Sequence, residues 1–104
     1  MRASLRGLGT AVPEHDIAQA DAAALALGLC RGIATEREAA LLPALYRRAA
    51  VGRRGSVLLS NENASGAVSQ EFFAPASSSA DRGPGTAERL RRFAADAPPL
   101  AARA

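Results

Sequence analysis

The segment LLPALYRRAAVGRRGSVLL, residues 41–59, constrains the fold more than any other part of the chain. Proline is well tolerated in the first turn of a helix, so Pro43 predicts that a short helix begins here. Two arginines lie in the last turn of this predicted helix, where the helix dipole favours cations. After a glycine that predicts a chain reversal, residues 55–59 are apolar and partly β-branched, as in a buried strand. A helix that leads into a strand through a basic turn predicts an α/β fold.

Four arginines flank this predicted turn, and they form the candidate binding site of the chain: Arg47, Arg48, Arg53 and Arg54. Planar guanidinium groups pair well with phosphate oxygens, so the cluster favours an anionic ligand. The alternative interpretation is a solvated corner in which the arginines cap backbone carbonyls. Both interpretations remain open at the level of the sequence.

The overall charge does not by itself indicate a nucleic-acid protein. All 13 basic residues are arginine, but ten acidic residues are interspersed among them, and the formal net charge is only +3. A dense basic stripe on one face, which is typical of nucleic-acid binding, is absent. We attribute most of the arginine bias to codon composition. Aromatic residues make up 4% of the 104 residues, so a core would consist mainly of alanine, leucine and valine, and one marginal domain is expected.

The N-terminal third predicts a strand and then a helix. Ser4–Val12 is interpreted as the strand, and Pro13 ends it. Asp16 and Gln19 have the spacing of a capping box, which predicts a helix through Ala20–Leu29. The core residues expected from this part of the chain are Ile17, Ala24, Leu25 and Leu29, and Arg31-Gly32 is expected to terminate the helix.

The middle of the chain combines a second capping box with a long polar loop. Thr35 and Glu38 have capping-box spacing, and because proline is costly inside a helix, we expect a kink or two short helices near Leu42. Asn61–Gly85 is rich in Ser, Ala, Asn, Gly and Pro and is predicted to be a surface loop. The adjacent Phe72 and Phe73 are expected to anchor this loop to the body or to a partner.

The C-terminal segment predicts one more helix. Thr86 is interpreted as its N-cap and Ala87–Ala97 as the helix, with an apolar stripe that includes Leu90 and Phe93. Pro98-Pro99 is expected to end it and to begin another helix, of which only about one turn is present. A single turn is unstable in isolation, so we interpret this end as cut.

Individual residues offer little catalytic chemistry. Cys30 is the single cysteine, which excludes an internal disulfide, and it is interpreted as a small apolar side chain. His15 is expected to be an exposed loop imidazole. The glycines before Thr86 match an anion-binding helix N-terminus, but an ordinary N-cap explains them better. No metal-ligand spacing, signal peptide or bilayer-length apolar run is found, so a cytoplasmic protein without membrane partners is expected.

Three blocks of sequence, in this order, resemble the N-terminal part of bacterial type III polyketide synthases, the chalcone and stilbene synthase-like enzymes of the thiolase fold. The blocks are LRGLGTAVPEHDIAQADAA, LLPALYRRAAVGRRGSVLL and PGTAERLRRFAADAPPLAARA. The resemblance covers nearly all of residues 1–104 and is weakest over 64–79. It implies an incomplete N-terminal half of a thiolase-like fold, with two or three strands, three or four helices and a long Ser/Ala/Gly loop, truncated before the nucleophile cysteine.

The resemblance also implies an activity that this segment does not complete. Family members are homodimeric, cytoplasmic acyltransferases that load an acyl group from coenzyme A onto a cysteine and extend it by decarboxylative condensation with malonyl-CoA. Cysteine, histidine and asparagine carry out the chemistry. Cys30 and His15 do not match these positions, so the chain is expected to be inactive alone, to carry no covalently bound cofactor and to expose apolar surface. Coenzyme A thioesters would be the substrates of the whole enzyme.

The basic helix is the part of a family site that carries over. Arg48 matches a position where family members bind the phosphates of coenzyme A, whereas Leu41 and Ala44 stand where others are basic. Ala50 stands where many relatives have glycine, so a positive φ there would make alanine strained. Alternatives are a related ketoacyl-ACP synthase III-like segment, a small arginine-rich module that binds RNA or another polyanion, and a regulatory fragment that pairs with a full-length synthase.

Overall fold

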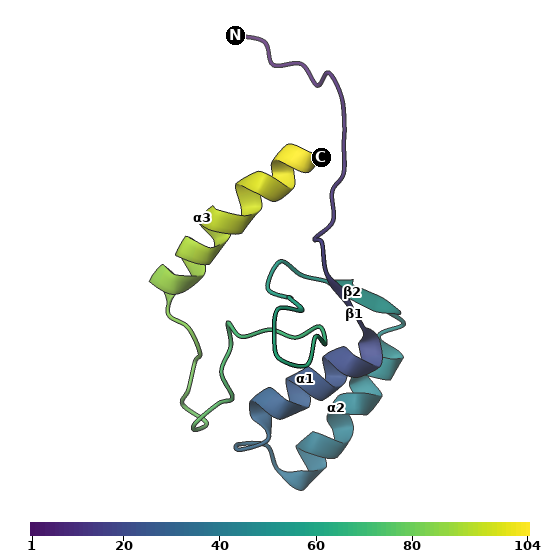
Figure 1. Ribbon diagram of the computed structural model, residues 1–104, viewed down its shortest axis with the longest axis vertical. Coiled ribbons are helices and arrows are strands. Elements are labelled where there is room, and N and C mark those ends of the chain that lie inside the picture. Colours follow the sequence, from purple (N-terminus) through teal and green to yellow (C-terminus); the bar gives the residue numbers. More distant parts are fainter.

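The computed structural model describes all 104 residues and shows a small mixed α/β arrangement (Figure 1). The elements follow the order β1 (Asp16–Ala18), α1 (Gln19–Cys30), α2 (Glu36–Arg48), β2 (Arg53–Gly55) and α3 (Thr86–Arg103). Three helices and a two-stranded sheet agree with the coarse α/β expectation. None of the helices combines the length and the apolar character needed to cross a membrane.

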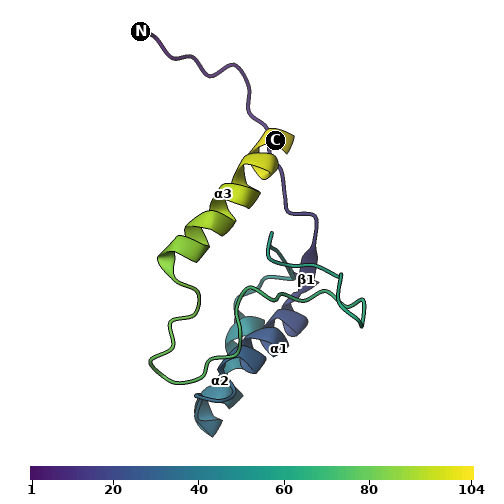
Figure 2. The same cartoon turned by 60° about the vertical axis from the view of Figure 1, so that its left-hand side comes forward.

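The packed body consists of α1 and α2 lying side by side, with the short sheet at one end (Figures 1 and 2). The two strands are antiparallel, and Ile17 lies opposite Arg54. The Gln19 N–H continues this connection by donating to the Gly52 carbonyl at 3.0 Å. The buried apolar residues are Ile17, Ala23 and Leu59, so the core is small and lies where β1 meets α1 and the segment after β2.

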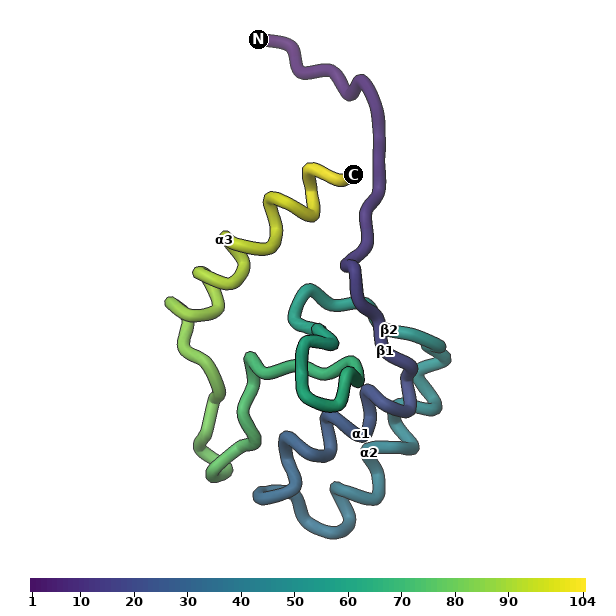
Figure 3. The backbone as a smooth tube through the Cα atoms, in the orientation of Figure 1, coloured from purple at the N-terminus to yellow at the C-terminus, as the bar shows by residue number.

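The strand predicted over Ser4–Val12 is wrong. These residues form an extended tail that leaves the body, and no β-pairing includes them (Figure 3). A strand needs a neighbour for its N–H and C=O groups, and the only partner, β2, is taken by Asp16–Ala18 instead. Without a partner the tail keeps its apolar side chains in water, with Leu5 85% and Leu8 90% exposed.

Of the three predicted N-caps, Thr35 is confirmed, whereas Asp16 and Thr86 are wrong, since Thr86 is the first residue of α3 and Gly85 is its N-cap. The Thr35 hydroxyl accepts from the Glu38 N–H at 3.2 Å and the Glu38 carboxylate accepts from the Thr35 N–H at 2.8 Å, which is the expected capping box. Asp16 does not cap α1, because it lies within β1 and its carboxylate binds an arginine. Ala18 is the N-cap of α1 and provides no side-chain hydrogen bond.

The breaks predicted at the prolines are absent. Helix α2 continues through Pro43, and α3 continues through Pro98-Pro99 to Arg103. The φ of proline is already helical, so the cost is confined to lost hydrogen bonds and crowding with the preceding turn. In α3 the carbonyls deprived of a donor belong to residues 94 and 95, which are exposed and can bind water. The predicted one-turn final helix is therefore the last turn of α3.

The strand predicted over Gly55–Leu59 is also wrong, since β2 ends where that prediction begins. The Leu58 N–H donates to the Ser56 hydroxyl at 3.2 Å, and the Leu59 N–H donates to the Ser56 carbonyl at 3.2 Å, so the chain turns. A serine that bonds its own neighbouring backbone competes with strand pairing. The expectation that this segment enters the core nevertheless holds for Leu59, which is 8% exposed.

The long loop after residue 60 is confirmed, and it is attached at a few points. It contains no helix or strand, only an isolated pairing of Ser60 with Ser69. The Ala76 N–H donates to the Leu29 carbonyl at 2.8 Å, which ties the loop to the end of α1. Phe72 and Phe73 pack edge to face with centroids 5.0 Å apart, and the Arg89 guanidinium of α3 lies 6.0 Å from the Phe73 ring centroid.

Much apolar surface is exposed, as the sequence led us to expect. The accessible surface is 8214 Å², whereas about 5,500 Å² is typical of a compact monomer of this mass. The radius of gyration is 17.0 Å, against about 13 Å for a compact chain of this length. Helix α3 lies apart from the other elements in both ribbon views (Figures 1 and 2). Its Leu90 and Phe93 are 61% and 69% exposed.

Candidate functional site

The four arginines of the candidate site lie at the end of the body where α2 leads into β2. Arg47 and Arg48 form the last turn of α2, and Arg53 and Arg54 are the first two residues of β2. All four are exposed. The connection between α2 and β2 is only four residues long, so the sequence places these guanidinium groups in one region, although each has different surroundings.

Arg53 is engaged by a carboxylate of the neighbouring strand. Its Nη2 donates to Asp16 Oδ1 at 2.7 Å, and the two side chains remain 60% and 52% exposed. This hydrogen bond from Arg53 is the main reason why the pKa of Asp16 lies below its ordinary value, and the same contact raises the pKa of Arg53. An anionic ligand would have to compete with Asp16 for this guanidinium.

Arg54 is engaged by the body of the protein. Its Nε donates to Gln19 Oε1 at 2.6 Å, and its guanidinium lies over the Tyr46 ring at 5.3 Å from the centroid. Gln19 is buried, and its Nε2 donates to the Tyr46 carbonyl at 2.8 Å. The arrangement satisfies both ends of the buried amide and joins α1, α2 and β2.

Arg47 and Arg48 remain available for a ligand. Neither takes part in the two ion pairs of the chain. Successive helical residues point about 100° apart, so the two guanidinium groups leave α2 in different directions. Arg47 lines a cavity between α1 and α2. Arg48 follows Leu41 and Leu45 at helical spacing, and these two leucines are 51% and 61% exposed.

The turn between α2 and β2 has the conformation that the sequence had singled out. Ala50 has φ 55°, in the left-handed region, and it is the only non-glycine residue of the chain with a positive φ. It follows the C-cap of α2, Ala49, which has φ −66°. This is the position at which helices commonly end with glycine, so alanine here is strained.

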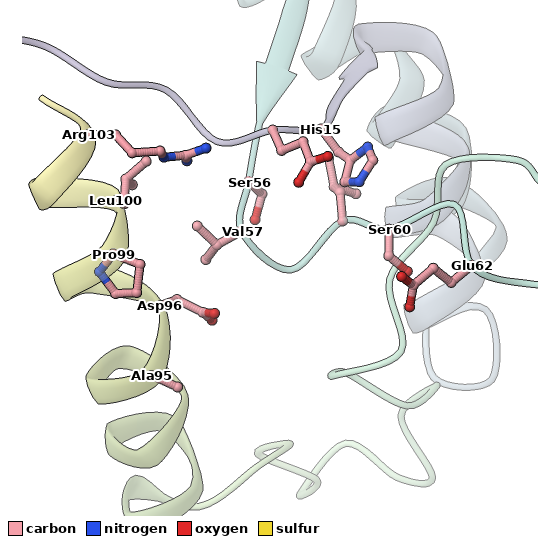
Figure 4. A pocket seen from close by; sticks show the side chains of 12 residues that line it. His15, Ser56, Val57, Ser60, Glu62, Ala95, Asp96, Pro99, Leu100 and Arg103 are labelled. Carbon is pink, nitrogen blue, oxygen red and sulfur yellow. The ribbon is translucent and has the colours of Figure 1, made fainter.

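A second cavity, of about 290 Å³, lies between α3, the segment before β1 and the segment after β2. Figure 4 shows His15 and Ser60 on the side of the body, and Asp96 and Arg103 on α3 opposite them. His15 is half-buried here and not the exposed loop imidazole that we expected. Asp96 is paired with Arg92, and Arg103 donates to the Val12 carbonyl at 3.3 Å, so these two charges are already engaged.

The cysteine and the acidic residues do not assemble into a reactive centre. Cys30 ends α1, at the opposite end of that helix from His15, and its thiol donates to the Leu27 carbonyl at 3.6 Å. No group of three or more His, Cys, Asp or Glu side chains is placed to hold a metal ion. Asp81 instead accepts from the Ser77 and Gly83 N–H groups at 3.0 and 2.8 Å, which lowers its pKa and closes a loop turn.

The sequence interpretation missed the contribution of Gln19 and Tyr46 to the site. The sequence predicts only a capping role for Gln19. A glutamine followed by an alanine-rich helix gives no local signal of long-range bonding, since the partner residues lie 27 and 35 positions away. Only the packing of α1 against α2 brings these groups together.

Comparison with known proteins returned no relatives: no family model, no curated protein and no solved structure matches this chain.

Proposed function

We propose that this chain is the N-terminal segment of a type III polyketide synthase-like acyltransferase, in which Arg48 and Arg47 bind the phosphates of coenzyme A thioesters. The proposal starts from the three sequence blocks that resemble this family, in their family order. The acyl transfer and the malonyl-CoA condensation would belong to the whole enzyme. Cys30 does not match the position of the reacting cysteine in that family.

The observation that carries the proposal is the exposed apolar surface. The accessible surface exceeds that of a compact monomer of this mass by about half, and Leu41, Leu45, Leu90 and Phe93 are all more than half exposed. Large apolar side chains exposed in such numbers are typical of surfaces that other polypeptide covers. In the proposed enzyme, the remaining strands and helices of the thiolase fold would cover these residues.

The arrangement of the arginines supports the division of the site. Arg53 and Arg54 have hydrogen-bond partners within the chain, whereas Arg47 and Arg48 have neither a hydrogen-bond nor an ion-pair partner. The helix dipole favours cationic guanidinium groups at the C-terminal end of a helix, and these groups can pair with phosphate oxygens. We therefore assign ligand binding to Arg48 and Arg47, and a structural role to Arg53 and Arg54.

Calorimetric titration of the 104-residue chain with coenzyme A tests the ligand. We expect saturable binding that Arg48→Ala weakens about fivefold, equivalent to about 1 kcal/mol. Arg91→Ala is the matched control, because Arg91 is also an exposed helical arginine without an ion pair. Absence of binding, or equal losses in both variants, would contradict the assignment. Binding to oligouridylate that falls steeply with salt, without any coenzyme A binding, would favour the polyanion module instead.

Gel filtration tests the segment proposal independently of the ligand. Because apolar side chains are exposed on α2 and α3, the isolated chain should self-associate as its concentration rises. A sharp monomer peak at all concentrations, together with a cooperative thermal transition, would count against a segment that needs further polypeptide.

A further inference from the structure

The cavity between α1 and α2 has a volume of about 530 Å³, which lies in the range of small-molecule pockets. Ala20, Ala23, Ala24 and Leu27 form its α1 wall at helical spacing. Alanine side chains extend by a single carbon, and the volume beside this wall is open in the structure. From α2 and the turn that follows it, Pro43, Tyr46 and Val51 complete the apolar lining.

The polar groups of this cavity leave one free charge. Gln19 lies at its edge, but both ends of its amide are bonded, to the Tyr46 carbonyl and to Arg54. Arg47 is the only charged residue of the lining, and no acidic residue faces it there. The guanidinium has no ion-pair partner in the chain. A complementary ligand is therefore apolar along its body and negatively charged at one end.

We propose that this cavity binds a medium-chain aliphatic carboxylate, with the alkyl chain between the helices and the carboxylate on Arg47. The wall from Ala20 to Leu27 extends about 10 Å along α1, which matches an extended chain of roughly eight to ten carbons. Charge complementarity with Arg47 fixes the orientation of the ligand. The cavity shares Arg47 with the proposed coenzyme A site, but Arg48 is not part of its lining, so the alkyl-carboxylate titration and the Arg48→Ala coenzyme A titration test the two proposals separately.

Tyrosine emission provides a direct readout of this binding. Tyr46 is the only tyrosine and the chain has no tryptophan, so intrinsic fluorescence reports from the cavity wall alone. Titration with decanoate, below its micelle concentration, should change the emission saturably. Arg47→Gln should weaken decanoate binding at least tenfold, and the control Arg91→Gln should leave it unchanged. Decanol should bind at least tenfold more weakly than decanoate.

Two further arms separate specific binding from other causes. Ala24→Phe should abolish binding by filling the cavity, with far-UV circular dichroism showing that α1 and α2 are retained. If Ala24→Phe unfolds the chain, the Arg47→Gln and decanol results decide whether the proposal holds.

Vesicles of phosphatidylglycerol should give no comparable change in tyrosine emission, since the proposed ligand is a single amphiphile and not a lipid surface. No response to decanoate, equal binding of decanol, or full binding by Arg47→Gln would each overturn the proposal. Failure of the coenzyme A titration alone would leave it standing.

Discussion

The left-handed residue at the end of α2 gives a sharp prediction. Ala50 has φ 55°, and a left-handed conformation costs a residue with a Cβ about 1–2 kcal/mol, a cost that glycine does not have. Glycine increases the conformational entropy of the unfolded chain, which opposes the gain by about 0.4–1 kcal/mol. The substitution Ala50→Gly should therefore stabilise the end of α2 by about 0.5–1 kcal/mol.

The neighbouring alanine is the matched control. Ala49 has φ −66° and ψ −11°, in the right-handed region, and its N–H donates to the Leu45 carbonyl at 3.1 Å. Glycine has no conformational advantage at this position, so Ala49→Gly should destabilise the same turn by up to about 1 kcal/mol. Two identical changes at adjacent residues are thus expected to have opposite signs.

Amide hydrogen exchange of α2 measures this difference without requiring global two-state unfolding. Protection of the last-turn amides of α2 should increase about two- to fivefold in Ala50→Gly and decrease in Ala49→Gly. Urea titration followed at 222 nm provides a second measure. Equal signs for the two variants, or a loss of protection in Ala50→Gly, would refute the assignment of strain to this residue.

Three other predictions concern an ion pair, a buried amide and a proline inside a helix. The Arg53 hydrogen bond lowers the folded-state pKa of Asp16, so this contact stabilises the fold at pH values above the ordinary carboxyl pKa. The stabilisation is lost as the pH falls through the folded-state pKa. Carbon NMR should show that Asp16 titrates at a lower pH in the unchanged chain than in Arg53→Gln. Gln19→Ala should destabilise the body by about 1–3 kcal/mol, because the Tyr46 carbonyl and the Arg54 guanidinium lose their hydrogen-bond partner. Urea titration measures this change, and an unchanged unfolding midpoint would contradict the prediction. Pro43→Ala should stabilise α2 by up to about 3 kcal/mol, because alanine restores a helical hydrogen bond. The expected measurement is an increase in helical circular dichroism. Unchanged helicity would show that Pro43 does not reduce the stability of α2.

The elements that sequence analysis predicted well are those specified by local interactions. The Thr35 capping box involves groups three residues apart, and the Ser/Ala/Gly-rich composition of 61–85 predicts a loop without reference to distant partners. The effect of a missing glycine at Ala50 is equally local, because the φ at a helix end is set by the chain reversal that follows it. In each case the physical cause lies within one turn of the backbone.

The predictions that failed depend on partners elsewhere in the chain. Ser4–Val12 has the composition of a strand but no neighbour, whereas Asp16–Ala18 is a strand because β2 lies beside it. Asp16 has the spacing of a cap but binds Arg53, 37 residues away. The proline signals failed for a different reason: a helix with enough residues on both sides can absorb the loss of one or two hydrogen bonds where water reaches the free carbonyls.

The division of the arginines follows from the same distinction between local and distant partners. Arg53 and Arg54 lie on a strand whose neighbour carries Asp16 and leads into Gln19, so β-pairing itself brings them to these groups. Arg47 and Arg48 lie on a helix, where pairing would require an acidic residue one turn away, and the residues at those positions are Pro43 and Ala44. The secondary structure therefore gives Arg53 and Arg54 hydrogen-bond partners within the fold and leaves Arg47 and Arg48 without one. Guanidinium groups that the fold leaves unbonded are the physical basis on which both proposed ligands, a phosphate and a carboxylate, depend.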